Sequence, residues 1–304
     1  MPHHIRLIFV RQAKSAAFAF LFNDSPKTSI GTNNGAKRSS QDRCHPDKLP
    51  GVTQNEEEIA SSLPADLDSL PRLKGFRLRG IEMTRLETFI DAAFAFAVTM
   101  LVIATGQVPD DIQALLVAFK NVPAFVASIA VLSIFWRGHW LWSRRFGLED
   151  GVSILISWAM LVTILIYVYP LKLLFGAMFY YVTDHAVGQS MTAQTEGQVR
   201  ALFAIYGLGF SAIAVEILLL NLRAWRLREP LRLNAHEKSL TRAEVFGWST
   251  PAAVGLTSLL LALTLPGEYI QWSGWVYMSM SFLVPLQRRW HARARRRRST
   301  ALED

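Results

Sequence analysis

The chain has 304 residues, of which 51% are hydrophobic and 18% are charged, and its formal net charge is +8. Its single cysteine, Cys44, excludes an intrachain disulfide framework, and no Cys/His spacing indicates structural zinc. Positive charge is typical of proteins that bind nucleic acids or acidic surfaces, but its meaning here depends on where the charges lie.

The charged residues are distributed very unevenly. Seven segments contain no Asp, Glu, Lys or Arg, and most approach the roughly 20 residues that cross a bilayer core. These segments are 92–109, 121–136, 151–171, 173–183, 201–215, 245–267 and 269–287. A soluble domain of this size cannot bury so many uncharged segments and still present a polar surface. The sequence therefore predicts an integral membrane protein.

Residues 1–80 precede the first uncharged segment and show no sustained hydrophobic period. With their scattered prolines and the acidic run Glu56 to Glu58, they are predicted to form a disordered cytosolic leader. The apolar stretch from Leu7 to Phe22 contains two basic residues and lacks a small-residue cleavage site, which argues against a signal peptide. Either the leader is a cytosolic tail, or translation really begins near Met83; we favour the second hypothesis, because an organised helix begins there.

From residue 81 onward the pattern indicates one helix after another, and the fold class is all-α with six transmembrane helices. The predicted spans are about 84–106, 115–138, 152–176, 200–222, 244–265 and 270–287. Pro170 is expected to kink the third span near its end, and residues 173–183 are too short to cross alone. We therefore predict a transmembrane domain over 81–290 and a basic cytosolic tail over 291–304.

The distribution of Lys and Arg predicts the orientation. Sixteen of these residues lie in segments 137–150, 223–244 and 288–304, and only three lie in the connections on the opposite side. Because basic residues favour the cytosolic side, both termini are expected in the cytosol. Directly after a span, the arginines from Arg288 to Arg298 are better explained as an anchor for anionic lipid than as a nucleic-acid site.

The sequence carries no enzymatic signature. It has no glycine-rich phosphate loop, no HExxH pair, no nucleophile elbow and no paired carboxylates deep in the membrane. We therefore expect a protein that is not an enzyme and that has neither a metal site nor a cofactor.

The first span holds the densest information. Asp91 lies near its cytosolic end, where an acid is costly unless it is paired or faces water, so Asp91 is a candidate functional residue. Ala92, Phe96, Thr99 and Ile103 follow helical spacing and form a stripe that is apolar apart from one hydroxyl. Taken alone, such a stripe is better explained by helix packing than by pore lining.

The motif Arg85-x-x-x-Phe89-Ile90-Asp91, followed by an alanine-rich and aliphatic helix with a threonine, resembles the first-span signature of the endosomal/lysosomal potassium channel family (transmembrane protein 175) and its prokaryotic relatives. That signature reads R-x-x-x-F-S-D. In the second span, Trp136-x-x-His139 is similar to the family's W-x-x-H-H-x-x-F segment. The resemblance covers about 81–220.

The resemblance implies a homotetramer with a central pore lined by the four first spans, conducting potassium as the permeant ion. It places the hydrophobic constriction at Phe96, with Thr99 beside it and Ile103 forming a further layer. With these assignments, pore lining becomes the preferred interpretation of the stripe. The resemblance also assigns a polar network at the base of the first helix to Arg85, Phe89, Asp91, Trp136 and His139.

Two positions depart from the family pattern. Ile90 replaces the motif serine, and Phe96 is bulkier than the usual constriction residue. The departures leave open a non-conducting scaffold, and the acids leave open a proton-coupled transporter that uses Asp91 or Glu216. For Glu216, we expect an ion pair with a nearby arginine such as Arg223.

Overall fold

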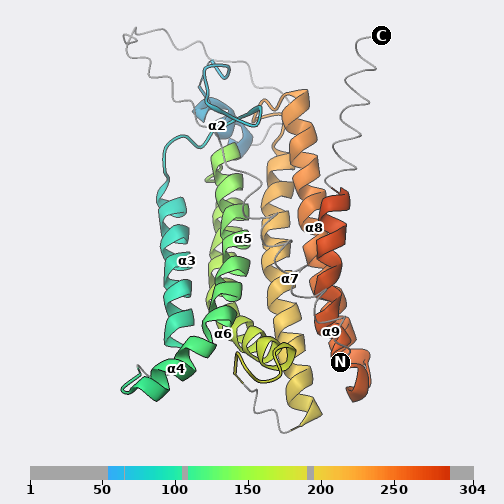
Figure 1. The fold of residues 1–304 in the computed structure, drawn as a ribbon. Helices are drawn as coiled ribbons and strands as arrows, with labels where there is room; N and C mark the ends of the chain where they lie inside the picture. Colours follow the sequence, from blue (N-terminus) through green and yellow to red (C-terminus); the bar gives the residue numbers. More distant parts are fainter. Residues whose placement is uncertain (1–53, 65, 105–108, 190–194, 288–304) are drawn as a thin grey trace.

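The computed structural model describes residues 54–64, 66–104, 109–189 and 195–287, and these residues form a bundle of long helices (Figure 1). The long helices are α3 (Arg85–Ile103), α5 (Val122–Phe146), α6 (Gly151–Val182), α7 (Glu196–Arg226) and α8 (Ala235–Thr264). All five are long and apolar enough to cross a membrane, whereas the shorter α4 (Ile112–Lys120) is not among these candidate spans. Five of the six predicted spans therefore have a matching helix in the structure.

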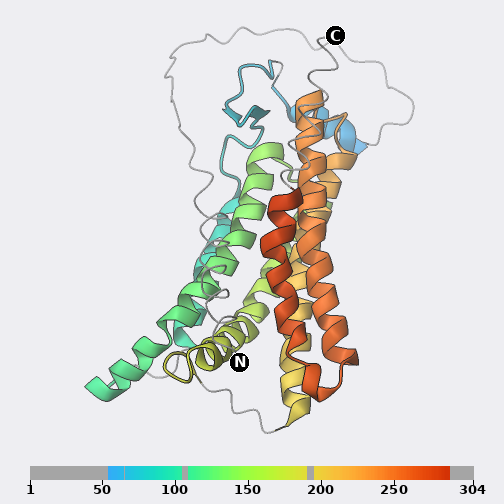
Figure 2. The same ribbon diagram turned by 45° about the vertical axis from the view of Figure 1, so that its right-hand side comes forward.

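The sixth predicted span, 270–287, is less regular. It follows the short helix η1 (Gly267–Tyr269) and consists of α9 (Trp272–Trp275), a 3-10 turn η2 (Val276–Ser279) and helical residues 280–287. Figure 2 shows this segment returning alongside α8. Within the described residues it does not qualify as a span by length, so the count of six remains a prediction.

The second predicted span has different boundaries in the structure. Asn121 closes α4, its backbone N–H bonding to Ala118 and Phe119, and α5 begins at once with Pro123 in its first turn. A proline lacks the backbone N–H that a first-turn residue does not use, so this position starts a helix easily. As a result α4 points away from the bundle (Figure 2), and α5 continues to Phe146, where Gly147 ends it in a left-handed conformation (φ 59°).

Residues 173–182 are not a separate span, because they continue α6. Pro170 lies inside this helix and removes one of its backbone hydrogen bonds. The last turns of α6 lie across the direction of the other helices (Figures 1 and 2), in agreement with the predicted kink near the end of the third span.

The tightest packing joins α7 to α8. A Cβ atom added to Gly255 would lie 2.9 Å from the backbone nitrogen of Ser211, and one added to Gly207 would lie 3.0 Å from that of Leu259. Small residues allow helix backbones to approach this closely in membranes, where dispersion contacts drive association. In contrast, α3 packs against α5 and α6 at one side of the bundle, and α8 lies on the other side (Figure 1).

The boundary of the predicted leader at residue 80 is wrong. Residues 1–53 lie outside the described residues, but residues 54–80 contain α2 (Gln54–Ser62) and an antiparallel hairpin of β1 (Arg72–Leu73) and β2 (Phe76–Arg77). Phe76 is fully buried in a cluster with Trp142, Phe146 and residues of α7. A strand of two residues is too short to leave a periodic pattern in the sequence. The hairpin is stabilised instead by its tertiary contact with the helix bundle. A chain starting at Met83 would lack this hairpin.

Candidate functional site

The first long helix, α3, has two distinct faces. Its buried face consists of Glu87, Ile90, Phe94, Ala97 and Leu101, at alternating spacings of three and four residues. These side chains pack against α5 and α6. Ile90, which replaces the serine of the motif, is 1% exposed and belongs to this apolar face. An apolar contact of Ile90 with the neighbouring helices therefore replaces the hydroxyl group that the motif serine would provide.

The three predicted pore-lining residues lie on the opposite, exposed face of α3. Phe96 is 51% exposed, Ile103 is 60% exposed, and Thr99 is exposed between them. The Thr99 hydroxyl donates a hydrogen bond to the carbonyl of Ala95 at 3.1 Å, which satisfies the hydroxyl inside its own helix. Among the described helices, none covers this face, so a single chain presents an apolar stripe with one hydroxyl.

Two of the five residues predicted to form a polar network at the base of α3 are in contact. The indole Nε1 of Trp136, on α5, donates a hydrogen bond to Asp91 Oδ1 at 2.8 Å. Asp91 is half-buried, so this bond compensates for the partial loss of water around a carboxylate. Phe89 contacts a third helix, because its ring lies 5.2 Å from that of Trp158 in α6.

The structure does not bring Arg85 or His139 to this acid. Arg85 is exposed at the first position of α3. His139 is 2% exposed and faces α6, with Nε2 at 3.1 Å from the hydroxyl of Ser157. The five residues therefore do not form one network: Trp136 binds Asp91, whereas His139 contacts Ser157.

An ion pair that the sequence did not reveal joins α3 to α5. Glu87 is 2% exposed, and its Oε1 lies 3.1 Å from Nε of Arg144. Nη1 of Arg144 also donates to the carbonyls of Gly80 and Ile81, at 3.2 and 3.0 Å. Arg144 thus holds both the first turn of α3 and the segment leading into it. The available signal was an acid in the first turn and a basic helix end on the same predicted side.

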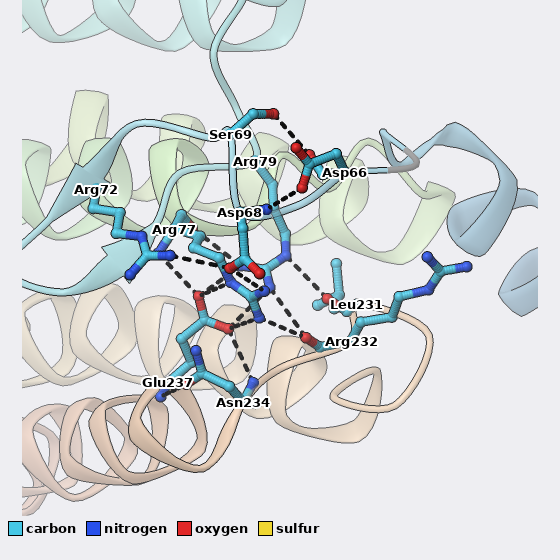
Figure 3. A network of polar contacts seen from close by, with 10 residues as sticks. All are labelled: Asp66, Asp68, Ser69, Arg72, Arg77, Arg79, Leu231, Arg232, Asn234 and Glu237. Atoms are coloured by element: carbon cyan, nitrogen blue, oxygen red, sulfur yellow. Dashed lines mark hydrogen bonds and ion pairs between the residues drawn. The ribbon is translucent and has the colours of Figure 1, made fainter.

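A larger polar cluster joins the β1–β2 hairpin to the start of α8 (Figure 3). Glu237 is fully buried and accepts hydrogen bonds from the backbone N–H and the guanidinium of Arg77 at 2.9 to 3.0 Å. Arg79 adds a bond at 3.0 Å, and the backbone N–H of Asn234 completes a capping box at 3.1 Å. Guanidinium groups bind a carboxylate at two points, so this arrangement fixes the hairpin on α8.

The two arginines differ in their electrostatic surroundings. The hydrogen bond to Glu237 holds the pKa of Arg77 above its ordinary value. Burial lowers the pKa of Arg79, although Glu237 partly offsets this effect. Both guanidinium groups stay charged at neutral pH, because an arginine pKa starts above 12.

The predicted partner of Glu216 is wrong. Arg223 instead binds Asp150, at the start of α6, with Nη2 and Nε at 2.9 and 3.0 Å from Oδ2. Glu216 lies seven residues before Arg223 in α7, about two helical turns deeper, and its Oε1 accepts a hydrogen bond from the Thr163 hydroxyl at 2.8 Å. Its Oε2 is buried and, within the described residues, has no hydrogen-bond partner.

Within the part of the chain that the structure describes, no group of three or more His, Cys, Asp or Glu side chains could hold a metal ion. The described site consists of the apolar exposed face of α3 and the hydrogen bond between Trp136 and Asp91 near the start of that helix.

Comparison with known proteins identifies the family. The profile described as endosomal/lysosomal potassium channel TMEM175 matches residues 85–170, which include α3, α5 and the first part of α6. A curated relative from Marivirga tractuosa, named "Potassium channel", is 32% identical over 199 residues, covering 63% of this chain and 79% of that protein. The chain belongs to the TMEM175 family.

A solved structure supports the fold. The crystal structure of a threonine-to-alanine variant of the potassium channel MtTMEM175, in complex with a nanobody fusion, aligns with a TM-score of 0.63 at 27% identity. The alignment covers 75% of this chain and all of that one. The relatives are potassium channels, which are not enzymes, and no enzymatic family is indicated.

Proposed function

We propose that the chain conducts potassium as a homotetramer, with the exposed face of α3 from each copy lining a central pathway. The observation that carries the proposal is the position of Phe96, Thr99 and Ile103, which share one exposed face opposite the buried face of α3. One helix cannot enclose a pathway, so several copies must contribute it. Potassium is the permeant ion, and no cofactor is required.

Phe96 forms the constriction in this proposal, with Ile103 as a second apolar layer. Rings of apolar side chains gate narrow pores by excluding water, and four phenyl groups would close a narrow opening more fully than smaller side chains. Thr99 lies between the two layers, and its hydroxyl is the one polar group of this stripe. The bond from Trp136 to Asp91 supports the base of the same helix.

We place the end of the bundle that carries the α5–α6 and α7–α8 connections, which we name the basic end, in the cytosol of a bacterium. The arginines at this end include Arg144, Arg145, Arg223 and Arg242, and their excess favours this orientation in the plasma membrane. The tail from Arg288 to Arg298 would then lie at the anionic cytosolic leaflet.

A proton-coupled transporter is the second candidate, and Glu216 is the observation that favours it. A buried carboxylate oxygen without a hydrogen-bond donor, on a membrane helix, is a conventional site for a transferable proton. Asp91 fits this role less well, because Trp136 already binds it and it is half-exposed. A non-conducting scaffold is the third candidate, suggested by Ile90 and Phe96.

Potassium efflux from liposomes containing the purified protein separates these functions. We expect wild-type protein to dissipate a potassium gradient without a proton gradient, and Phe96→Ala to increase the efflux severalfold because it widens the constriction. The matched control is Leu260→Ala on α8, which removes an apolar side chain that is 60% exposed and is expected to leave the efflux unchanged.

Unchanged efflux in Phe96→Ala would remove this residue from the pore. Transport that requires a proton gradient and is lost in Glu216→Gln would establish the transporter instead. If none of these proteins transports potassium, the non-conducting scaffold would be the remaining candidate function.

A further inference from the structure

Trp225, near the end of α7, is flanked by two arginines at the basic end of the bundle. The guanidinium carbon of Arg228 lies 5.1 Å from the centroid of the indole ring, and that of Arg242, on α8, lies 5.0 Å from it. Nη1 of Arg228 also donates a hydrogen bond to the carbonyl of Trp225 at 3.1 Å. Cation–π contacts of this length hold a guanidinium in place and leave its remaining N–H groups able to bind an anion. Two preorganised cations therefore share one aromatic platform.

The acidic groups around this platform neutralise it only in part. Glu229 lies 3.6 Å from Nε of Arg228, but it also accepts a hydrogen bond from Lys238 at 2.9 Å. Arg242 is exposed, and the described residues provide it with no carboxylate within ion-pair distance. The platform consequently keeps a net positive charge.

An apolar surface continues from this charge into the membrane-spanning part of α8. Arg242, Phe246 and Thr250 follow at intervals of four residues, which places them along one side of the helix. Phe246 is 49% exposed. Below it, Thr250, Leu283, Leu286 and Gln287 line an open groove of about 390 Å³ between α8 and the last helical segment.

Gln287 closes the end of the groove that lies nearest the charge. Its side-chain amide donates to the carbonyl of Phe246 and accepts a hydrogen bond from Thr250 at 3.0 Å. The chain then continues directly into Arg288 and Arg289. Eight residues of α-helix separate Arg242 from Thr250, or about 12 Å, close to the thickness of the hydrocarbon in one leaflet.

A surface that is cationic at the membrane boundary, apolar one helical turn deeper at Phe246 and grooved a further turn below matches an anionic phospholipid. We propose that this surface, the Trp225 corner, binds one such lipid, with the phosphate on Arg228 and Arg242 and an acyl chain over Phe246 in the groove. A zwitterionic lipid offers the same chains but no net charge, so charge complementarity selects the anionic class.

The position of the corner in the bundle allows a lipid to reach it. α8 and the last helical segment lie on the opposite side from α3 in both views (Figures 1 and 2). An assembly through α3 would therefore leave the Trp225 corner facing the bilayer. The proposal depends on membrane insertion but not on potassium conduction, so the two can fail separately.

Native mass spectrometry of the purified full chain in mild detergent tests the proposal, with phosphatidylglycerol and phosphatidylcholine as probes. We expect the first bound phosphatidylglycerol to bind about 30-fold more tightly than phosphatidylcholine, since each arginine near a membrane surface contributes about one factor of five. The double variant Arg228→Gln/Arg242→Gln should lose this preference. The double variant Arg226→Gln/Arg232→Gln is the matched control, because it removes two exposed charges from the same end of the bundle.

A second variant tests the groove without changing the charge. Leu286 is 65% exposed at the groove, so Leu286→Trp should fill the groove and weaken binding of both lipids while leaving the fold intact. Equal affinity of wild-type protein for the two lipids would overturn the proposal. So would unchanged preference in the Arg228→Gln/Arg242→Gln variant, or an equal loss in the Arg226→Gln/Arg232→Gln control, which would indicate a response to net charge alone.

Discussion

The α7–α8 pair and α3 are both membrane helices, but they are stabilised in different ways. α7 and α8 approach so closely at Gly207 and Gly255 that an added Cβ would lie 3.0 Å or less from the backbone of the other helix, and the hairpin is bound to the start of α8 through the buried Glu237. α3 packs through one face only and exposes the other, which includes Phe96. The pair is complete within one chain, whereas α3 presents a surface suited to contacts outside it.

This difference separates the parts of the molecule that maintain the fold from the part that carries the proposed function. A substitution in the α7–α8 pair or its polar cluster should lower stability, because every partner is already in place. A substitution on the exposed face of α3 should change transport and leave the stability of the chain nearly unaffected. The following substitutions test this division, beginning with the largest expected effect.

Glu237→Ala should have the largest effect on stability. It would leave the guanidinium groups of Arg77 and Arg79 buried without their carboxylate, which typically costs about 3–5 kcal/mol. Denaturant unfolding in detergent, followed by circular dichroism, measures this loss.

Asp68→Ala is the matched control for that substitution. Asp68 pairs with Arg72 at 3.0 Å and lies at the edge of the cluster, 3.7 Å from Nη1 of Arg77, but its side chain is 77% exposed, so removal should cost less than about 1 kcal/mol. Equal losses for the two variants would show that the cluster around Glu237 does not stabilise the fold.

Gly255→Ala should have the next largest effect. The added Cβ would meet Ser211 at 2.9 Å and force α7 and α8 apart, which typically costs about 1–3 kcal/mol. Gly247→Ala, in the same helix, is the control, because a Cβ there meets nothing within 4 Å. Since alanine favours helices over glycine, the control should be neutral or stabilising by up to about 1 kcal/mol. Thermal unfolding of both variants gives the comparison, and a stable Gly255→Ala would contradict the close packing of α7 on α8.

Asp91→Ala should have the smallest effect of the three. It removes the acceptor of the Trp136 indole at a half-buried site, where one hydrogen bond contributes about 1 kcal/mol. Asp91→Asn keeps an acceptor oxygen and should lose less. Thermal unfolding followed by tryptophan fluorescence measures both variants. A loss above about 3 kcal/mol in the Asn variant would show that the charge itself, rather than the acceptor, supports the base of α3.

Much of the bundle could be predicted from the distribution of charges, because long uncharged segments have few alternatives in a chain that enters a membrane. The predicted spans at 84–106 and 200–222 overlap α3 and α7 closely. The division between α4 and α5 was not predicted, because both sides of Asn121 are equally apolar and only the local geometry at Pro123 separates them.

The polar contacts were harder to predict than the helices. Trp136 and Asp91, both named for the predicted network, are hydrogen-bonded, but Arg223 binds Asp150 rather than Glu216. Sequence spacing identifies neighbours within one helix and gives no information on which helix lies opposite. The hairpin around Arg77 was missed for the same reason, since its partner Glu237 lies 160 residues further along the chain.

The three contacts of Arg144 have a mechanical consequence for α3. One guanidinium holds Glu87 in the first turn and the carbonyls of Gly80 and Ile81 just before it. The start of α3 is thereby attached to α5 through one side chain. If α3 tilted about this attachment, the displacement of its residues would be smallest at Arg85 and greatest at Ile103. A small change in angle would therefore move the end of the helix farthest from the hairpin the most.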